Sequence, residues 1–482
     1  MENEDSSYFT RHSLFAFVYA FYLGDLFEDF DELKEFIFSL RNVDIVDDFV
    51  DFDRILSGYK EHFDLFSSIL AESLLKILDD EYVSSEKFLI ASVKFSDNIT
   101  VNLDKLSNFK VGIRKAFLFI HKTGICILII ICESRNYLDF QEFFDFTHLN
   151  EAKLVNYSLA SSLEDFIDIF KLDNDEMSFE DLISLYSDFI RYIFWSKIRN
   201  KNIKSIDDLY NYVEYNYDHF YRLVYFIPYE KKSIKDFLSS RSYEIYSLLM
   251  SEDVDIVRKF APYVVDEVFD NNLSFEEDKA FYVEQDLSLT VFSPMFIDFL
   301  IEKYGDYEET LYQYLLEDIV YFEIIILWDL VLDIVDYLIN DILYNKKIFP
   351  SSIADIEHNI LLMLNEFYGI RTFNSQEDEE FINIAKEKLG IANKYNNVRE
   401  KLNLLETVSN MSFQESSQIY QVYLTIIFGA FTIGQTILAI LAIILNNIIS
   451  SIILSNLSIL ATIFLGLIFI RKWLISKDKI SK

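Results

Sequence analysis

Three aspartates lie on one face of a predicted helix in the second half of the chain. Asp329, Asp333 and Asp336 stand at positions i, i+4 and i+7, which share a face of an α-helix. Carboxylate oxygens are the ligands that a hard cation such as Mg²⁺ prefers, while the ion keeps much of its own water. The spacing is consistent with Mg²⁺ binding by this face of the helix. The alternative is a solvated acidic face, which is common in a chain with 79 Asp and Glu residues.

Other sequence motifs that carry chemistry are missing. The 10 glycines form neither G-x-x-x-x-G-K nor G-x-G-x-x-G, so no phosphate-binding loop is predicted. The 6 histidines are scattered singly, whereas zinc sites need clustered nitrogen and sulfur ligands. No G-x-S-x-G pattern and no local Cys/His signature of a nucleophilic enzyme occurs. The sequence therefore predicts a protein that is not an enzyme.

The composition narrows the possible partners. A formal net charge of −36 disfavours nucleic acid, because the phosphate backbone would be repelled at every approach. The 46 Phe and 31 Tyr residues supply enough apolar surface for a packed core. Cys126 and Cys132 are the only cysteines, and their spacing puts them on one face of a strand, too far apart to bridge. Two reduced thiols in the core are expected.

The first 300 residues mix helical and strand patterns. From Ser13 to about Asp80 the apolar residues recur at helical spacing, which predicts helices. Strands are predicted at Phe88–Phe95, with Val101–Leu103 as a partner, at Ala116–Ile120 and Ile125–Cys132 joined by a turn at Gly124, and at Ala280–Val283 and Leu287–Phe292. The run Ile125–Cys132 is apolar on both faces, so we expect a central strand covered by helices. Ser178 and Asp181 predict the start of a helix.

After Pro294 only helices are predicted. Leu311–Tyr344 forms a long helix, and a return helix covers Ile353–Tyr368. The next helix begins near Asp378 and shows heptad spacing. Because no proline interrupts the chain from there to Ile470, this helix is expected to continue into the apolar segment that follows.

That segment, Ser416–Ile470, contains no Asp, Glu, Lys, Arg or His. A bilayer core needs roughly 20 apolar residues per helix, so the run predicts two crossings, Ile419–Leu445 and Ile452–Ile470. The charged residues after Ile470 are five basic residues and one Asp, and the turn between the crossings is uncharged. Basic flanks mark the cytoplasmic side. A multi-pass protein of the cell membrane with both termini in the cytoplasm is expected, with the lipid bilayer as its first partner.

Together these elements predict an α+β fold that is mostly helical. It has a cytosolic body with a small β-sheet, a long stalk helix and a C-terminal two-helix transmembrane hairpin. The predicted segments are an N-terminal helical segment at 1–80, a cytosolic α/β body at 81–300, stalk helices at 301–415, and the hairpin with its basic cytosolic tail at 416–482.

The order of elements from about residue 276 to residue 482 resembles the CorA family of divalent-cation (magnesium) transporters. A β-hairpin, an acidic helix, a return helix, a long helix entering the bilayer, a second crossing and a basic tail follow one another. Short strings are similar too: Tyr314-Leu315-Leu316, Leu424-Thr425-Ile426-Ile427 and Arg471-Lys472-Trp473-Leu474. The resemblance implies a homo-oligomer, a pentamer around an axial pore, in which cytosolic carboxylates at subunit interfaces sense Mg²⁺ and hold the pore closed.

One departure from the family pattern bears on function. The family signature Gly-Met-Asn, at the outer end of the first membrane helix, does not occur in the chain. Asn446 and Asn447 lie slightly beyond its expected place and offer amide oxygens at a pore mouth, or they are ordinary turn residues. Two functions stay open: a CorA-like transporter or channel for a divalent metal cation, with Mg²⁺ as the bound ion, and a membrane-anchored acidic cytosolic scaffold or sensor without transport activity.

Overall fold

The computed structural model describes residues 8–49, 88–94, 100–103, 111–149, 152–156, 159–172, 177–213, 218–269, 271–274, 277–305, 307–345, 376–405 and 407. The chain divides into two compact units. The first comprises Met1–Asp333 and Phe367–Lys394, and the second comprises Ile334–Glu366 and Tyr395–Lys482. The boundary falls within one long helix, so each unit is described by itself.

An 11-stranded sheet forms the centre of the first unit, with the main order β10-β11-β9-β1-β6-β5-β3-β2. Its strands are β1 (Tyr8–Tyr22), β2 (Val46–Phe49), β3 (Phe88–Val93), β4 (Thr100–Leu103), β5 (Val111–His121), β6 (Ile125–Ser134), β7 (Leu138–Asp139), β8 (Ala152–Asn156), β9 (His219–Pro228), β10 (Lys279–Val283) and β11 (Leu287–Phe292). The pairing of β11 with β9 is parallel, and the other pairings are antiparallel.

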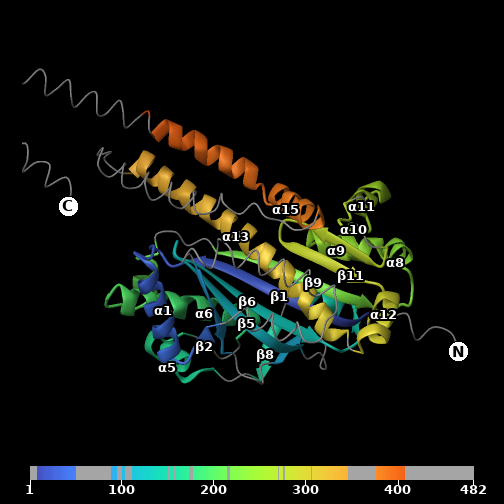
Figure 1. Ribbon diagram of the computed structural model, residues 1–482, viewed down its shortest axis with the longest axis horizontal. Helices are drawn as coiled ribbons and strands as arrows, with labels where there is room; N and C mark the ends of the chain where they lie inside the picture. The colour runs from blue at the N-terminus through green and yellow to red at the C-terminus, as the bar shows by residue number, and fades with distance from the viewer. Residues whose placement is uncertain are drawn as a thin grey trace, which may run out of the picture. The chain divides into compact units, whose positions relative to one another are not determined.

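The helices surround this sheet (Figure 1). They are α1 (Phe30–Asn42), α4 (Phe140–Thr147), α5 (Ser161–Phe170), α6 (Phe179–Ile193), continued by a π-helical turn (Phe194–Ile198), α7 (Ile206–Tyr210), α8 (Ile234–Ser240), α9 (Ser242–Met250), α10 (Val254–Val257), α11 (Pro262–Phe269), α12 (Pro294–Tyr304), α13 (Glu308–Asn345) and α15 (Gln376–Lys388). The helix start predicted at Ser178 and Asp181 is confirmed, because these residues form a capping box at the start of α6, which satisfies amide groups that lack a partner within the helix.

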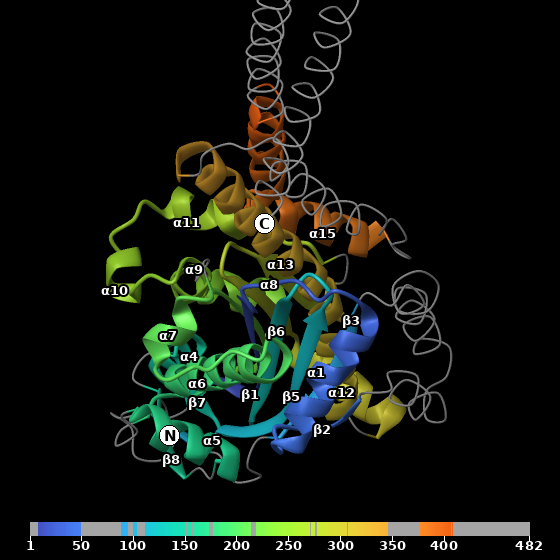
Figure 2. The same ribbon diagram turned by 90° about the vertical axis from the view of Figure 1, so that its left-hand side faces the viewer.

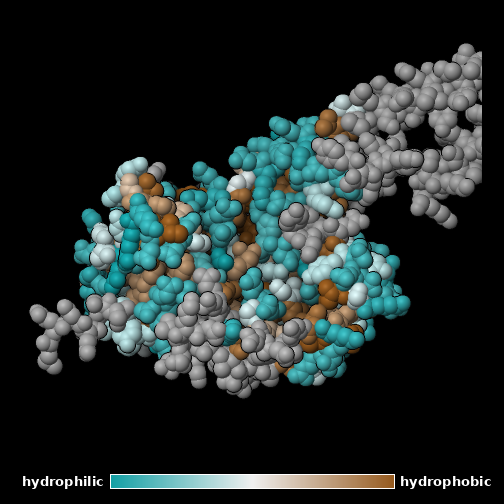
Figure 3. All heavy atoms as spheres, turned by 180° about the vertical axis from the view of Figure 1, so that it is seen from behind, coloured by the Kyte–Doolittle hydropathy of each residue, from teal (hydrophilic) through white to brown (hydrophobic). Residues whose placement is uncertain are grey.

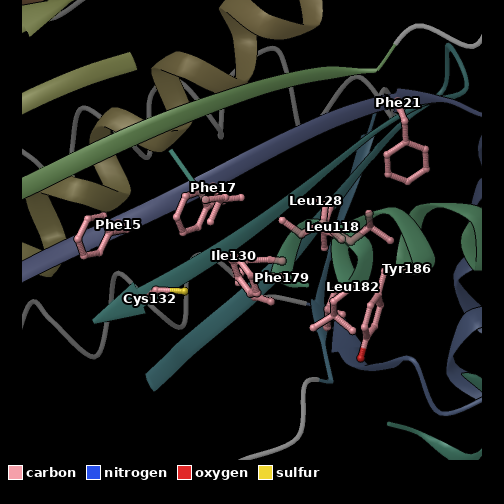
Figure 4. Close-up of a cluster of buried hydrophobic side chains, with 14 of the residues drawn as sticks. Phe15, Phe17, Phe21, Leu118, Leu128, Ile130, Cys132, Phe179, Leu182 and Tyr186 are labelled. Atoms are coloured by element: carbon pink, nitrogen blue, oxygen red, sulfur yellow. The ribbon is translucent and has the colours of Figure 1, made fainter. Parts of the chain in front are cut away.

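One face of the sheet packs on α1, α4 and α6. Alternate residues of the strands supply this face, and Figure 4 shows Phe15, Phe17 and Phe21 of β1 beside residues of β5, β6 and α6. The ring of Phe17 meets that of Phe179 on α6 edge-on at 5.4 Å. This cluster is the main hydrophobic core of the first unit.

The opposite face of the sheet packs on α13 and α15. In Figures 1 and 2 α13 lies on one side of the strands, and α1 and α6 lie on the other. Tyr221 on β9 packs on Phe322 of α13, with 4.6 Å between the ring centroids. The ring centroid of Phe322 lies 5.1 Å from that of Phe381 on α15. Helices on both faces explain why β6 is buried along almost its whole length. The predicted central strand is confirmed.

Both predicted hairpins are confirmed, β5–β6 and β10–β11. Cys126 and Cys132 are buried and free, as expected. The partner predicted for the strand at residue 88 is wrong, because β4 pairs with β5 and β8. The described surface seen in Figure 3 is largely hydrophilic, in keeping with the charge of the chain.

The fold-class prediction, a mostly helical α+β chain with a small sheet and a transmembrane hairpin, is wrong. The sheet is the organising element of the first unit, and β1, which lies beside β6 in the middle of the sheet, occupies the start of the segment predicted to be helical. Within the described residues, no helix combines the length and the apolar character that crossing a membrane requires. The residues predicted to form the hairpin, 416–470, lie outside the described residues, and so does the predicted return helix.

The helix predicted to run unbroken from Asp378 is also corrected. α15 ends at Lys388, and Gly390 follows with φ +66°, a left-handed conformation that ends helices and that glycine adopts without strain. A new helical stretch covers residues 391–405.

Candidate functional site

Two of the three predicted aspartates come together with a histidine and a lysine. Asp329 and Asp333 lie one turn apart on α13, and His219 is the first residue of β9. Lys394 follows the turn at Gly390. Potential ligand atoms of His219, Asp329 and Asp333 all lie within 4.8 Å of one another. We call these four side chains the His219 cluster.

In the His219 cluster, His219 and Lys394 each contact both aspartates. His219 Nδ1 lies 2.8 Å from Asp329 Oδ2, and His219 Nε2 lies 3.2 Å from Asp333 Oδ2. Lys394 Nζ donates to Asp329 Oδ1 at 2.6 Å and to Asp333 Oδ2 at 2.8 Å. Each carboxylate therefore faces both cationic groups. Asp329 is 6% exposed, whereas the other three side chains are between 22% and 32% exposed. The cluster therefore lies at the solvent-facing edge of the contact between α13 and the sheet.

Each shift in pKa favours the charged form of its group. Burial alone lowers the pKa of His219, but hydrogen bonds to Asp329 and Asp333 outweigh it and raise the pKa to about 9. Burial raises the pKa of Asp333, but His219 and Lys394 bring it below its usual value. Burial lowers the pKa of Lys394, and the two aspartates raise it above the ordinary value. Two positive and two negative groups therefore balance at neutral pH.

This balance bears directly on the predicted Mg²⁺ site. The ammonium of Lys394 already holds the place of a cation between the two carboxylates. Mg²⁺ demands near-octahedral oxygen coordination and gives up its water reluctantly, so it competes poorly at a site that offers an imidazole nitrogen. The His219 cluster suits a divalent ion that accepts both nitrogen and oxygen.

Asp336 belongs to the second unit and has its own partners. Lys401 Nζ donates to both of its oxygens, at 2.6 and 2.9 Å, and the Asn340 amide donates to it at 3.0 Å. The structure thus divides the predicted trio. Asn446 and Asn447, the predicted residues of a pore mouth, lie outside the described residues.

Other acidic residues of α13 contact side chains of the sheet. Glu323 meets His121 of β5 in a buried contact, and the hydroxyl of Tyr225 on β9 donates to Asp318. Glu323 is buried and Asp318 is half-buried, so these two carboxylates pack against the sheet. Acidic residues of α13 therefore serve packing as well as any binding.

A second charged cluster surrounds Arg191 of α6 and includes Asp218, the residue that precedes His219 in the chain. Arg191 on α6 is fully buried and reaches Asp218 at 2.5 Å, Asp188 at 3.3 Å and the carbonyl of Tyr22 at 3.1 Å. A buried charge requires such partners. This network has the character of a structural cross-link between α6 and the sheet.

Sequence reasoning missed His219 and Lys394. A lone histidine carries no local signal, and both residues reach α13 from distant parts of the chain. One signal was present: Lys394 and Lys401 repeat the seven-residue spacing of Asp329 and Asp336 with the opposite charge.

The comparisons give no relative from which a role could be transferred. Neither protein-family models, nor curated proteins, nor solved structures give a match to this chain.

Proposed function

We propose that this protein binds divalent cations through its acidic helix α13 and acts at a membrane as a CorA-like cation transporter or channel. The observation that carries the binding part is the convergence of Asp329 and Asp333 with His219. Carboxylates brought together at a partly exposed edge can exchange one cation for another, here the Lys394 ammonium for a metal ion.

The membrane part of the proposal rests on the sequence. The uncharged run Ser416–Ile470 and the basic residues after it favour a location in the cell membrane, with the acidic body on the cytoplasmic side. The resemblance to the CorA family implies a homo-oligomer, a pentamer in that family. The negative body would then concentrate cations at the inner mouth of a pore.

A second candidate is a membrane-associated acidic scaffold or sensor without transport activity. One observation favours it: Asp329, Asp333 and Asp336 are each neutralised by a lysine of the same chain. Carboxylates with such partners do not require a transported ion. In this case cation binding changes the state of the body and moves nothing across the membrane.

Uptake separates the two candidates. The full-length chain is expressed in a host deficient in divalent-cation transport, and uptake of Mg²⁺, Co²⁺ and Ni²⁺ is measured beside a variant with Asn446→Ala and Asn447→Ala. Uptake above the empty host, together with a pentamer in detergent, is the expected result. A monomer or dimer without uptake would reject transport and leave the scaffold. Equal uptake by the two versions would clear the asparagines of a filter role.

A further inference from the structure

The His219 cluster combines ligands that no local motif brings together. One imidazole and two carboxylates from β9 and α13 place their ligand atoms within 4.8 Å of one another. A metal ion with bonds of roughly 2.0–2.2 Å holds its ligand atoms at most about 4.4 Å apart. Small side-chain movements are enough to close the set around an ion.

Lys394 mimics a bound ion in this arrangement. Its ammonium lies 2.6 Å from Asp329 and 2.8 Å from Asp333, and it contacts one oxygen of each carboxylate. The lysine side chain is long and flexible and is 32% exposed, so it can swing into water without opening the core. A metal ion and the lysine therefore compete for the same two carboxylates.

The nature of the ligands selects the class of ion. Imidazole nitrogen suits Zn²⁺, Ni²⁺ and Co²⁺, whereas Mg²⁺ prefers oxygen alone. Three protein ligands also leave a coordination position open to water, as in exchangeable or catalytic zinc sites. Asp336, which has no histidine among its described contacts, lacks this selectivity.

We propose that His219, Asp329 and Asp333 form a binding site for a divalent transition-metal ion, and that Lys394 occupies the cation position until the metal displaces it. This inference rests on the proposed function for its biological role and names the class of cation. The binding itself can be tested without any transport.

The test is calorimetric titration of the purified full-length protein with Zn²⁺, Ni²⁺ and, separately, Mg²⁺. Zn²⁺ and Ni²⁺ are expected to bind with one site per chain, and Mg²⁺ at least roughly tenfold more weakly. Lys394→Met removes the competing cation and leaves the ligands in place, so Zn²⁺ affinity should rise roughly tenfold or more. His219→Gln should lower Ni²⁺ affinity by roughly tenfold or more, because it removes the nitrogen ligand.

Lys401→Met is the matched control, since it removes the lysine from Asp336 and leaves the His219 cluster intact. It should leave Zn²⁺ affinity unchanged. The proposal is overturned if Lys394→Met weakens or does not alter Zn²⁺ binding, or if His219→Gln leaves Ni²⁺ binding intact. Should Lys394→Met fail to fold, the wild-type chain decides: Zn²⁺ that neither binds nor raises its melting temperature overturns the proposal. Metal binding without ion uptake would keep this site and reject only transport.

Discussion

A carboxylate held among positive partners stabilises a fold only while it is ionised, and Glu133 on β6 is such a residue. Its side chain is 12% exposed and lies 3.0 Å from His12 Nε2 and 2.8 Å from Arg135 Nε. Burial raises the pKa of Glu133, but hydrogen bonds from His12 and Arg135 outweigh burial and lower the pKa from 4.5 to about 2. The carboxyl group of Glu133 therefore binds a proton less tightly in the folded protein than in the unfolded chain.

The consequence is a defined loss of stability in acid. The contribution of Glu133 is fully present above about pH 4.5 and disappears as the pH falls towards 2. A shift of this size corresponds to roughly 3 kcal/mol of unfolding free energy. In urea unfolding at a series of pH values, Glu133→Gln should be less stable at pH 7 and lose less stability in acid. Glu164→Gln, at an exposed position of α5, is the control. Parallel acid profiles for Glu133→Gln and wild type would refute the assignment.

At the His219 cluster, the sequence was enough to predict the acidic half and not the basic half. The i, i+4 spacing of Asp329 and Asp333 is a local property of one helix, and α13 holds them on one face as predicted. His219 and Lys394 reach them only through tertiary packing. An acidic pattern on one helix predicts that cationic side chains or ions lie opposite it, but it does not identify the residues that supply them.

Among the elements, the turn between β5 and β6 depends on a glycine. Gly124 has φ +75°, and a Cβ there would lie 1.9 Å from the carbonyl oxygen of Asp25. Its own carbonyl accepts a hydrogen bond from the Leu23 amide at 2.9 Å, which fixes the end of β1 beside the turn. If the turn moved away from Asp25, this hydrogen bond between Leu23 and Gly124 would be lost.

Gly124→Ala should destabilise the protein by more than roughly 2 kcal/mol, because left-handed strain and a backbone clash add together. Gly112 on β5 is the matched control, since a Cβ there meets no atom within 4 Å. Gly112→Ala should change stability by less than roughly 1 kcal/mol, with a slight gain possible within a strand. Urea unfolding of both variants measures the difference. Equal changes in the unfolding free energy of the two variants would show that the backbone near Asp25 can move to accommodate the new Cβ without destabilising the protein.

The elements also show where sequence patterns mislead. β1 was predicted to be helical because Leu14, Phe17, Val18 and Tyr22 match helical spacing. A strand buried on both faces has no alternation of apolar and polar residues, so its true period is hidden. β6 was recognised because its run is short and rich in isoleucine. The absence of proline does not guarantee a continuous helix, since α15 ends at Lys388 and is followed by Gly390 in a left-handed conformation.

For the whole molecule, the dominant electrostatic fact is a formal charge of −36 on 482 residues. Pairs such as Glu284 with Lys388, at 2.7 Å, offset a small part of it. Exposed ion pairs contribute only about 0–1 kcal/mol each, and basic residues are too few to pair with all the acids. Repulsion among unpaired carboxylates therefore opposes the compact state.

Screening should relieve this repulsion. Raising NaCl from ~10 mM to ~300 mM shortens the Debye length from about 30 Å to below 10 Å, so the melting temperature of the full-length protein should rise by several degrees. MgCl₂ at equal ionic strength should give nearly the same rise, because Lys394 and His219 already neutralise Asp329 and Asp333. A melting temperature that falls with NaCl would mean that ion pairs outweigh repulsion. A much larger rise with MgCl₂ would instead reveal a magnesium site that the His219 cluster does not account for.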